Sequence, residues 1–178
     1  MATGLVAFGA VVSLILFYVI GGPFGAINDV GNALIGILSA LLAFASRGIA
    51  RTHWLAIGVA VVGAALTIVG TFLVISETTG FFLAGLWSSV GYAFIGAWLV
   101  LLNRSSALAN RWPRSLRTAG LLAGAAMLAG VVAVPGILMG VDDFDAVPPW
   151  LWIFSVGWLG TYLIYPAWCF WIGRVERR

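Results

Sequence analysis

Six long apolar stretches, separated by short connections, constrain this chain more than any other feature. They cover approximately residues 2–20, 23–46, 54–75, 80–102, 118–140 and 149–172. A bilayer core about 30 Å thick needs roughly 20 consecutive apolar residues in a helix, because each helical residue rises about 1.5 Å. The sequence therefore predicts an all-α integral membrane protein with six transmembrane helices.

The composition agrees with a membrane protein and narrows the chemistry it can perform. Charged residues make up 8% of the chain, against about a quarter in soluble domains. All nine basic residues are arginine, a bias typical of GC-rich bacterial genomes. Because the chain has no lysine, it can form neither a lysine Schiff base nor a P-loop that uses a lysine. One cysteine, Cys169, and one histidine, His53, allow no intrachain disulfide and no multi-histidine metal site. We expect no cofactor and no metal.

The charges alternate along the chain and predict its orientation. Segments 47–53, 103–117 and 173–178 hold all nine arginines, whereas the other connections hold acidic residues such as Glu77 and Asp142. Short arginine-rich connections stay in the cytoplasm. The N-terminus lacks the basic region of a signal peptide, so the first apolar run is expected to be a retained span. We therefore expect a multi-pass protein of the bacterial inner membrane with both termini cytoplasmic.

An internal similarity suggests that the six helices arose from a repeated hairpin. When residues 21–42 are aligned with 81–102, eight positions are identical. A further offset of 66 places Val156-Gly157 on the same Val-Gly pair. This pattern predicts one six-span domain with pseudo-threefold symmetry. Its three hairpins would cover approximately residues 2–46, 54–102 and 118–172.

The alignment also decides where Asp29 lies. Pro149 is well placed to be the first residue of the last helix, and Pro23 aligns with it. The second helix would then begin near Pro23, after a Gly21-Gly22 turn that tolerates positive φ. Asp29 would lie six residues in, roughly 9 Å down the helix. We therefore expect Asp29 inside the membrane span and not in a loop.

The second helix carries two opposite stripes at helical spacing. One stripe is small or polar throughout and consists of Gly25, Asp29, Asn32, Gly36, Ser39 and Ala43. The other is aliphatic and suits lipid, and it consists of Ile27, Val30, Leu34, Leu38 and Leu41. Small residues let membrane helices approach closely, and polar ones bond between them. Because Ser89 and Ser155 occupy the positions equivalent to Asp29, we expect all three in one polar layer inside the bundle.

The candidate ligand-binding residues surround this layer. They are Asp29, Asn28, Asn32, Ser89, Tyr92, Ser155, Trp158 and Tyr162. An acidic residue within a membrane span marks an ion, proton or substrate site, and every arginine lies at the opposite end of the helices. The alternative is that Asn28, Asp29 and Asn32 only cap the helix and bond neighbouring helices. Trp158 and Tyr162 likewise either line an apolar pocket or simply pack.

Two hypotheses of different classes follow. The first is a small permease, channel or ligand-binding membrane protein with an outward-facing acidic site for a cation, proton or small amine. The second is a non-transporting accessory or sensory subunit whose polar layer is structural. The acidic residues in the connections without arginine would either attract cations or have no role beyond the charge asymmetry that sets the orientation. An enzyme is a third interpretation, although no nucleophile–base pair emerges. No nucleic-acid motif is present, the bilayer is the expected partner, and a homo-oligomer is compatible with so small a bundle.

Overall fold

The computed structural model describes residues 1–50 and 54–177, and all of its regular structure in these ranges is helical. Within them, six helical segments are long and apolar enough to cross a membrane. They are Ala2–Ile20, Phe24–Gly48, Trp54–Ile75, Phe81–Arg104, Arg114–Leu138 and Pro149–Val175. The protein is therefore a multi-pass membrane protein, as the apolar runs predicted. His53, the single histidine, lies outside the described residues.

The first four spans are continuous helices, and the last two are interrupted. The continuous ones are α1 (Ala2–Ile20), α2 (Phe24–Ala50), α3 (Trp54–Ile75) and α4 (Phe81–Arg104). The fifth span joins α5 (Arg114–Leu128), the 3₁₀ segment η2 (Ala129–Val132) and α6 (Ala133–Leu138). The sixth joins η4 (Pro149–Phe154), α7 (Ser155–Leu159), η5 (Gly160–Ile164) and α8 (Tyr165–Val175). Short 3₁₀ turns, η1 (Ser106–Leu108) and η3 (Phe144–Ala146), lie in the connections.

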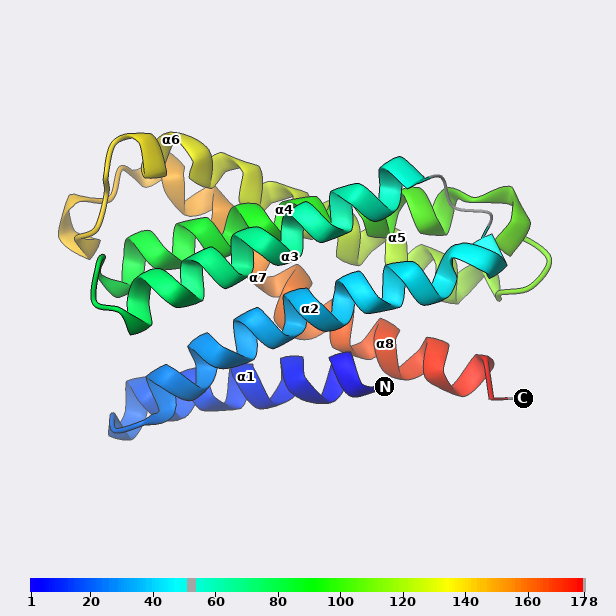
Figure 1. The fold of residues 1–178 in the computed structure, drawn as a ribbon, viewed down its shortest axis with the longest axis horizontal. Helices are drawn as coiled ribbons and strands as arrows, with labels where there is room; N and C mark the ends of the chain where they lie inside the picture. The colour runs from blue at the N-terminus through cyan, green and yellow to red at the C-terminus, as the bar shows by residue number, and fades with distance from the viewer. Residues whose placement is uncertain (51–53, 178) are drawn as a thin grey trace.

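Helices that follow one another in the chain lie side by side, and α8 returns to contact α1 (Figure 1). The most buried span is α4, which packs extensively against α3 on one side and α5 on the other. Glycines allow this close packing. A Cβ atom on Gly63 of α3 would come within 2.6 Å of the Gly91 carbonyl oxygen of α4, and one on Gly124 of α5 within 2.7 Å of the Gly96 carbonyl oxygen. Small residues at these contacts are what membrane helix association requires.

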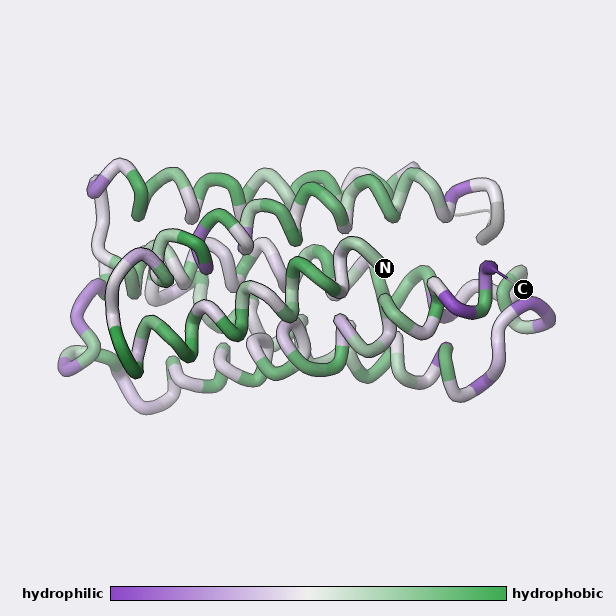
Figure 2. Tube along the Cα trace, turned by 90° about the horizontal axis from the view of Figure 1, so that it is seen from below, coloured by the Kyte–Doolittle hydropathy of each residue, from purple (hydrophilic) through white to green (hydrophobic). Residues whose placement is uncertain are grey.

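Polar residues concentrate at the two ends of the bundle, with mainly apolar positions between them (Figure 2). We name these ends by their charges. The arginine end includes connection 105–113 and residues 176–177, and α2 ends there. The acidic end contains connections 21–23, 76–80 and 139–148.

The fifth span begins at Arg114 and not near Thr118 as predicted, because Pro113 and not a later residue precedes the first helical turn.

The turn before α2 agrees with its sequence pattern. Gly21 and Gly22 have φ values of 70° and 72°, a region that glycine enters without steric cost. Helix α2 begins at Phe24, directly after Pro23, and contains Asp29. The prediction that Asp29 lies within a membrane span is therefore confirmed.

Both stripes of α2 are also confirmed. Every member of the small and polar stripe is buried, from Gly25 to Ala43. The aliphatic stripe faces outward, with Ile27 49% and Leu41 57% exposed, although Leu38 is half-buried. Helix α2 thus presents Asp29 to the interior of the bundle.

Prolines explain the irregular backbone of the last two spans. Pro166 has no N–H to donate to the carbonyl of Tyr162 four residues earlier. The preceding turn, Gly160–Ile164, is π-helical, and Tyr165 N–H bonds to the Gly160 carbonyl five residues back. In the fifth span, Pro135 follows the 3₁₀ segment Ala129–Val132. These irregular turns change which side chains face the interior.

Candidate functional site

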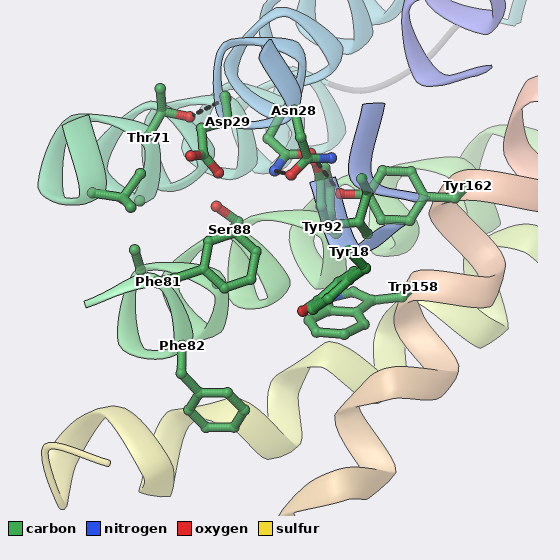
Figure 3. A pocket seen from close by; sticks show the side chains of 16 residues that line it. Tyr18, Asn28, Asp29, Thr71, Phe81, Phe82, Ser88, Tyr92, Trp158 and Tyr162 are labelled. Atoms are coloured by element: carbon green, nitrogen blue, oxygen red, sulfur yellow. Dashed lines mark hydrogen bonds between the residues drawn. The ribbon is translucent and has the colours of Figure 1, made fainter. Parts of the chain in front are cut away.

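A small cavity lies between α1, α2, α3, α4 and the last span (Figure 3). We call it the Asp29 cavity. Its lining residues in α2 and α4 lie in the halves of these helices nearer the acidic end. Its lining residues are Leu14, Tyr18, Asn28, Asp29, Asn32, Gly70, Thr71, Val74, Phe81, Phe82, Ala84, Gly85, Ser88, Tyr92, Trp158 and Tyr162. The space that the centre of a water molecule can occupy measures about 30 Å³, whereas the whole hollow with its open mouth measures about 530 Å³. The smaller value decides what fits inside, because the larger one includes open solvent.

Asp29 is the only acidic residue that lines this cavity among the described residues. The residue is 9% exposed. Within residues 1–50 and 54–177 the carboxylate has no hydrogen-bond partner, and no arginine lines the cavity. The Asp29 backbone is held from α3, since the Thr71 hydroxyl donates to its carbonyl oxygen at 2.6 Å. The carboxylate is therefore positioned by backbone contacts but not neutralised by a side chain.

Ser88 of α4 faces Asp29 across the cavity. Its hydroxyl and the Asp29 carboxylate point toward one another (Figure 3). Ser88 is 6% exposed, and its hydroxyl also has no hydrogen-bond partner in the described part of the chain. It packs over Gly70 of α3, where any larger residue would strike the hydroxyl oxygen. Two unpaired polar side chains from different helices thus meet at one small space.

A network of hydrogen bonds lies beside this pair and joins four spans. Tyr92 and Tyr162 both donate to the side-chain oxygen of Asn32, at 2.7 and 2.6 Å. The Asn32 amide donates to the side-chain oxygen of Asn28 at 3.3 Å, and Asn28 donates to the Ala10 carbonyl at 2.9 Å. The four side chains are at most 8% exposed. Sequence analysis expected these residues at one site, and the structure brings them together.

Trp158 and Ser89 form a second, separate contact. The Trp158 indole N–H donates to the Ser89 hydroxyl at 3.0 Å, and that hydroxyl donates to the Gly85 carbonyl at 2.8 Å. Trp158 lines the cavity, but Ser89 does not. Ser89 therefore holds the Trp158 ring in place at the edge of the cavity and does not itself line the cavity with Asp29.

Ser155 does not reach the polar layer in which sequence analysis placed it. Its hydroxyl donates to the Trp152 carbonyl at 2.7 Å, and the residue is absent from the cavity lining. The 3₁₀ segment Pro149–Phe154 has about three residues per turn, so the buried positions here are Leu151, Phe154 and Gly157, and Ser155 lies beside this line. Trp158 and Tyr162, further along the same span, do line the cavity.

Comparisons with protein-family models, with curated proteins and with solved structures find no match to this chain. The site must therefore be interpreted from its own geometry.

The acids of the acidic end differ in their surroundings. Asp142 accepts hydrogen bonds from the backbone N–H groups of Gly80 and Leu83, at 2.5 and 3.0 Å, and so caps the start of α4. Asp143 accepts from Asp145 N–H at 3.0 Å. The carboxylates of Asp142 and Asp143 thus have local hydrogen bonds, whereas that of Asp29 has none within the described residues. Within the described residues, no group of three or more histidine, cysteine or acidic side chains could hold a metal ion.

Sequence reasoning missed Ser88, Thr71 and Tyr18. Ser88 aligns with Asn28 in the proposed repeat, so the alignment carried a signal for it. The choice between Ser88 and its neighbour Ser89 needed the rotation of α4, which packing determines. Thr71 and Tyr18 lie on very apolar helices whose patterns do not single out one face.

Proposed function

We propose that this protein is a small permease-type membrane protein in which Asp29 binds a cation or a proton from the acidic end. The observation that carries the proposal is the unpaired carboxylate of Asp29, a residue only 9% exposed, in a cavity shared with the unpaired Ser88 hydroxyl. An isolated charge in an apolar interior is costly. Acids retained within membrane spans therefore tend to have a functional role.

The distribution of arginine supports an orientation for this site. In the described residues, every arginine lies toward the arginine end and none lines the Asp29 cavity. By the positive-inside rule, we propose that the arginine end and both termini are cytoplasmic in a bacterial inner membrane. The cavity would then open toward the outside.

The three-hairpin repeat is part of the proposal. Asn32 and Tyr92, which are separated by the repeat offset of 60 residues, bond to one another at 2.7 Å. The inward faces of α2, α4 and the last span all contribute to one cavity. This arrangement supports three related hairpins around one site.

Flux measurements test the proposed function. The purified protein is reconstituted in liposomes, and uptake of protons, sodium and methylammonium is measured down an imposed gradient. We expect uptake of at least one probe, lost in Asp29→Asn and Asp29→Ala. The matched control is Asp145→Asn, which changes the same chemical group outside the cavity and should keep wild-type flux. Equal flux in the wild type and both Asp29 variants would contradict the proposal.

A second function is favoured by the hydrogen-bond network. Because Asn28, Asn32, Tyr92 and Tyr162 satisfy one another, the polar layer also fits an accessory subunit in which it only specifies helix packing. Thermal unfolding in detergent separates the two. The packing function is correct if Asp29→Ala unfolds the bundle, neither sodium nor methylammonium shifts wild-type melting, and Asp29→Asn leaves the pH dependence of melting unchanged. A melting shift by pH or one probe that disappears in Asp29→Asn favours the permease.

A further inference from the structure

Resting on the proposed function, we infer that the occupant of the Asp29 cavity is a proton, shared between the Asp29 carboxyl and the Ser88 hydroxyl, and not a metal cation or an organic amine. This inference follows from the size of the cavity, the oxygens that are free to bind and the charges that face them.

The cavity is too small for an organic substrate. About 30 Å³ is available to the centre of a water molecule, which is room for one or two waters. Pockets for organic ligands measure roughly 300–1,000 Å³. The walls beside Asp29 include bulky apolar side chains such as Phe81, Phe82 and Val74. A proton, carried in by water, needs no more space than the cavity has.

Too few oxygens are free to surround a metal ion. Hard divalent cations take six or more oxygen ligands. In the described residues, the side-chain oxygens of the lining without a hydrogen bond are the two of the Asp29 carboxylate, the Ser88 hydroxyl and the hydroxyl of the exposed Tyr18. The Asn32 side-chain oxygen already accepts from two tyrosines, and the Thr71 hydroxyl donates to the Asp29 carbonyl. These four oxygens are too few for the six or more ligands of a divalent cation, whereas the Asp29 carboxylate and the Ser88 hydroxyl suffice to bind one proton.

Among the residues that the structure describes, no positively charged side chain lines the cavity. The titratable groups that line the cavity with Asp29 are Tyr18 from α1, Tyr92 from α4 and Tyr162 from the last span. The α3 lining consists of Gly70, Thr71 and Val74, none of which is titratable. Tyr92 and Tyr162 are donors to Asn32, and Tyr18 cannot become cationic. Because no neighbouring side chain can neutralise the Asp29 carboxylate, a proton is the smallest species that can.

The proton step is simple and balanced. A hydronium ion at the mouth of the cavity transfers its proton to an Asp29 carboxylate oxygen and leaves as water. The neutral acid then donates to the Ser88 oxygen through one water, for which the cavity has room. Release reverses these steps, so water is the only other reactant.

The network beside the pair limits this exchange to one side. Asn32 and Tyr92 lie about one helical turn closer to the arginine end than Asp29 and Ser88. All bonds of this network point in one direction, from the tyrosines through Asn32 and Asn28 to the Ala10 carbonyl. Amide groups do not pass protons along such a chain, and a buried cluster that includes Ile35, Trp98 and Leu99 follows. In this conformation a proton therefore reaches Asp29 from the acidic end alone.

Infrared difference spectroscopy of the protein in nanodiscs tests the inference without transport. As pH is lowered, the wild type should gain a C=O stretching band of a protonated carboxyl that is missing in Asp29→Asn. In Ser88→Ala this band should remain but shift in frequency, because the acid loses a hydrogen-bond acceptor. Asp145→Asn, outside the cavity, should keep both the band and its frequency. Replacing sodium with choline should leave the wild-type band unchanged.

Two results would overturn the inference. One is a wild-type spectrum with no band that depends on Asp29 at any pH. The other is a sodium-dependent change in the carboxylate bands that disappears in Asp29→Asn. If the Asp29 band is present but liposomes show no flux, the proposed permease function is wrong and the inference of a proton site is retained. If flux depends on Asp29 but the carboxylate bands respond to sodium, the permease function is retained and the inference that the occupant is a proton is wrong.

Discussion

Asp29 of α2 and Ser88 of α4 face one another across a small cavity, and neither side chain has a hydrogen-bond partner within residues 1–50 and 54–177 (Figure 3). Their neighbours, by contrast, are satisfied: Asn32 accepts from two tyrosines. The interior therefore contains a hydrogen-bonded layer that joins the helices and, beside it, a pair of polar side chains without hydrogen bonds. Four contacts of the fold each lead to a prediction that can be tested by substitution.

The first concerns Asn32 as the shared acceptor. Asn32→Leu leaves the buried hydroxyls of Tyr92 and Tyr162 without a partner, and we expect it to lower the free energy of unfolding by roughly 2 kcal/mol or more. Tyr92→Phe removes one donor while Tyr162 still bonds Asn32, and it should cost about 0.5–1.5 kcal/mol. Denaturant unfolding in detergent measures both. Equal effects of the two variants would contradict a shared acceptor.

The second concerns the close contact of α3 and α4. A Cβ on Gly63 would lie 2.6 Å from the Gly91 carbonyl oxygen, so Gly63→Ala must push the helices apart. We expect a loss of about 1–3 kcal/mol. Gly58→Ala in the same helix meets nothing within 4 Å and is the matched control. It should be neutral or stabilising, because alanine favours helix. A thermal unfolding series in which Gly63→Ala behaves like Gly58→Ala would rule out this packing.

The third concerns Asp142 as a cap contributed from a distant loop. Its carboxylate accepts from Gly80 and Leu83 at the start of α4, where N–H groups otherwise lack partners. Asp142→Ala should cost about 0.5–2 kcal/mol in unfolding free energy. Asp145→Ala removes an acid of the same loop and should change stability little. If both substitutions cost the same, net charge and not capping explains the effect.

The fourth concerns pH and the C-terminal contact at the arginine end. The Glu176 carboxylate accepts from Arg111 at 3.2 and 2.6 Å and from the Trp112 indole at 2.7 Å. The hydrogen bonds from Arg111 hold the pKa of Glu176 below its ordinary value. The same contact raises the pKa of Arg111.

Because the pKa of Glu176 is lower in the folded state, its stabilisation is complete above the ordinary glutamate pKa of about 4.3 and is lost as pH falls through the folded value. Because the contact lies at the surface and is screened by solvent, we expect this contribution to be small. Melting measured between about pH 7 and about pH 3 should show this loss in the wild type and a smaller one in Glu176→Gln. Glu77→Gln, in an opposite connection, should retain the wild-type dependence. A wild-type profile in Glu176→Gln would show that the contact does not stabilise the fold.

The position of Asp29 could be predicted because α2 has a lipid face. Its aliphatic stripe must turn toward the bilayer, and this rotation places Asp29, Asn32 and Ser39 inside. The turn at Gly21-Gly22 was equally readable, because positive φ is a property of the local chain. Orientation, the internal repeat and the identity of the ligand stay predictions.

The partner of Asp29 could not be predicted, because α4 is buried on most sides. With 67% of its span buried, α4 has no broad lipid stripe to define its rotation. Ser88 and Ser89 differ by about 100° around a helix, and only the contacts of Gly63, Gly91 and Gly96 with neighbouring helices select between them. Ser155 was misplaced for a related reason, since a 3₁₀ turn changed the period that its position assumed.

By itself the sequence determined the six spans, the glycine turn and the inward direction of Asp29, because hydropathy, proline and glycine act on the local chain. Tertiary structure alone decided that Ser88 faces Asp29, that two tyrosines converge on Asn32, and that the cavity holds little more than water. These features depend on how closely and at what rotation the helices pack, which is set by contacts between residues far apart in the chain.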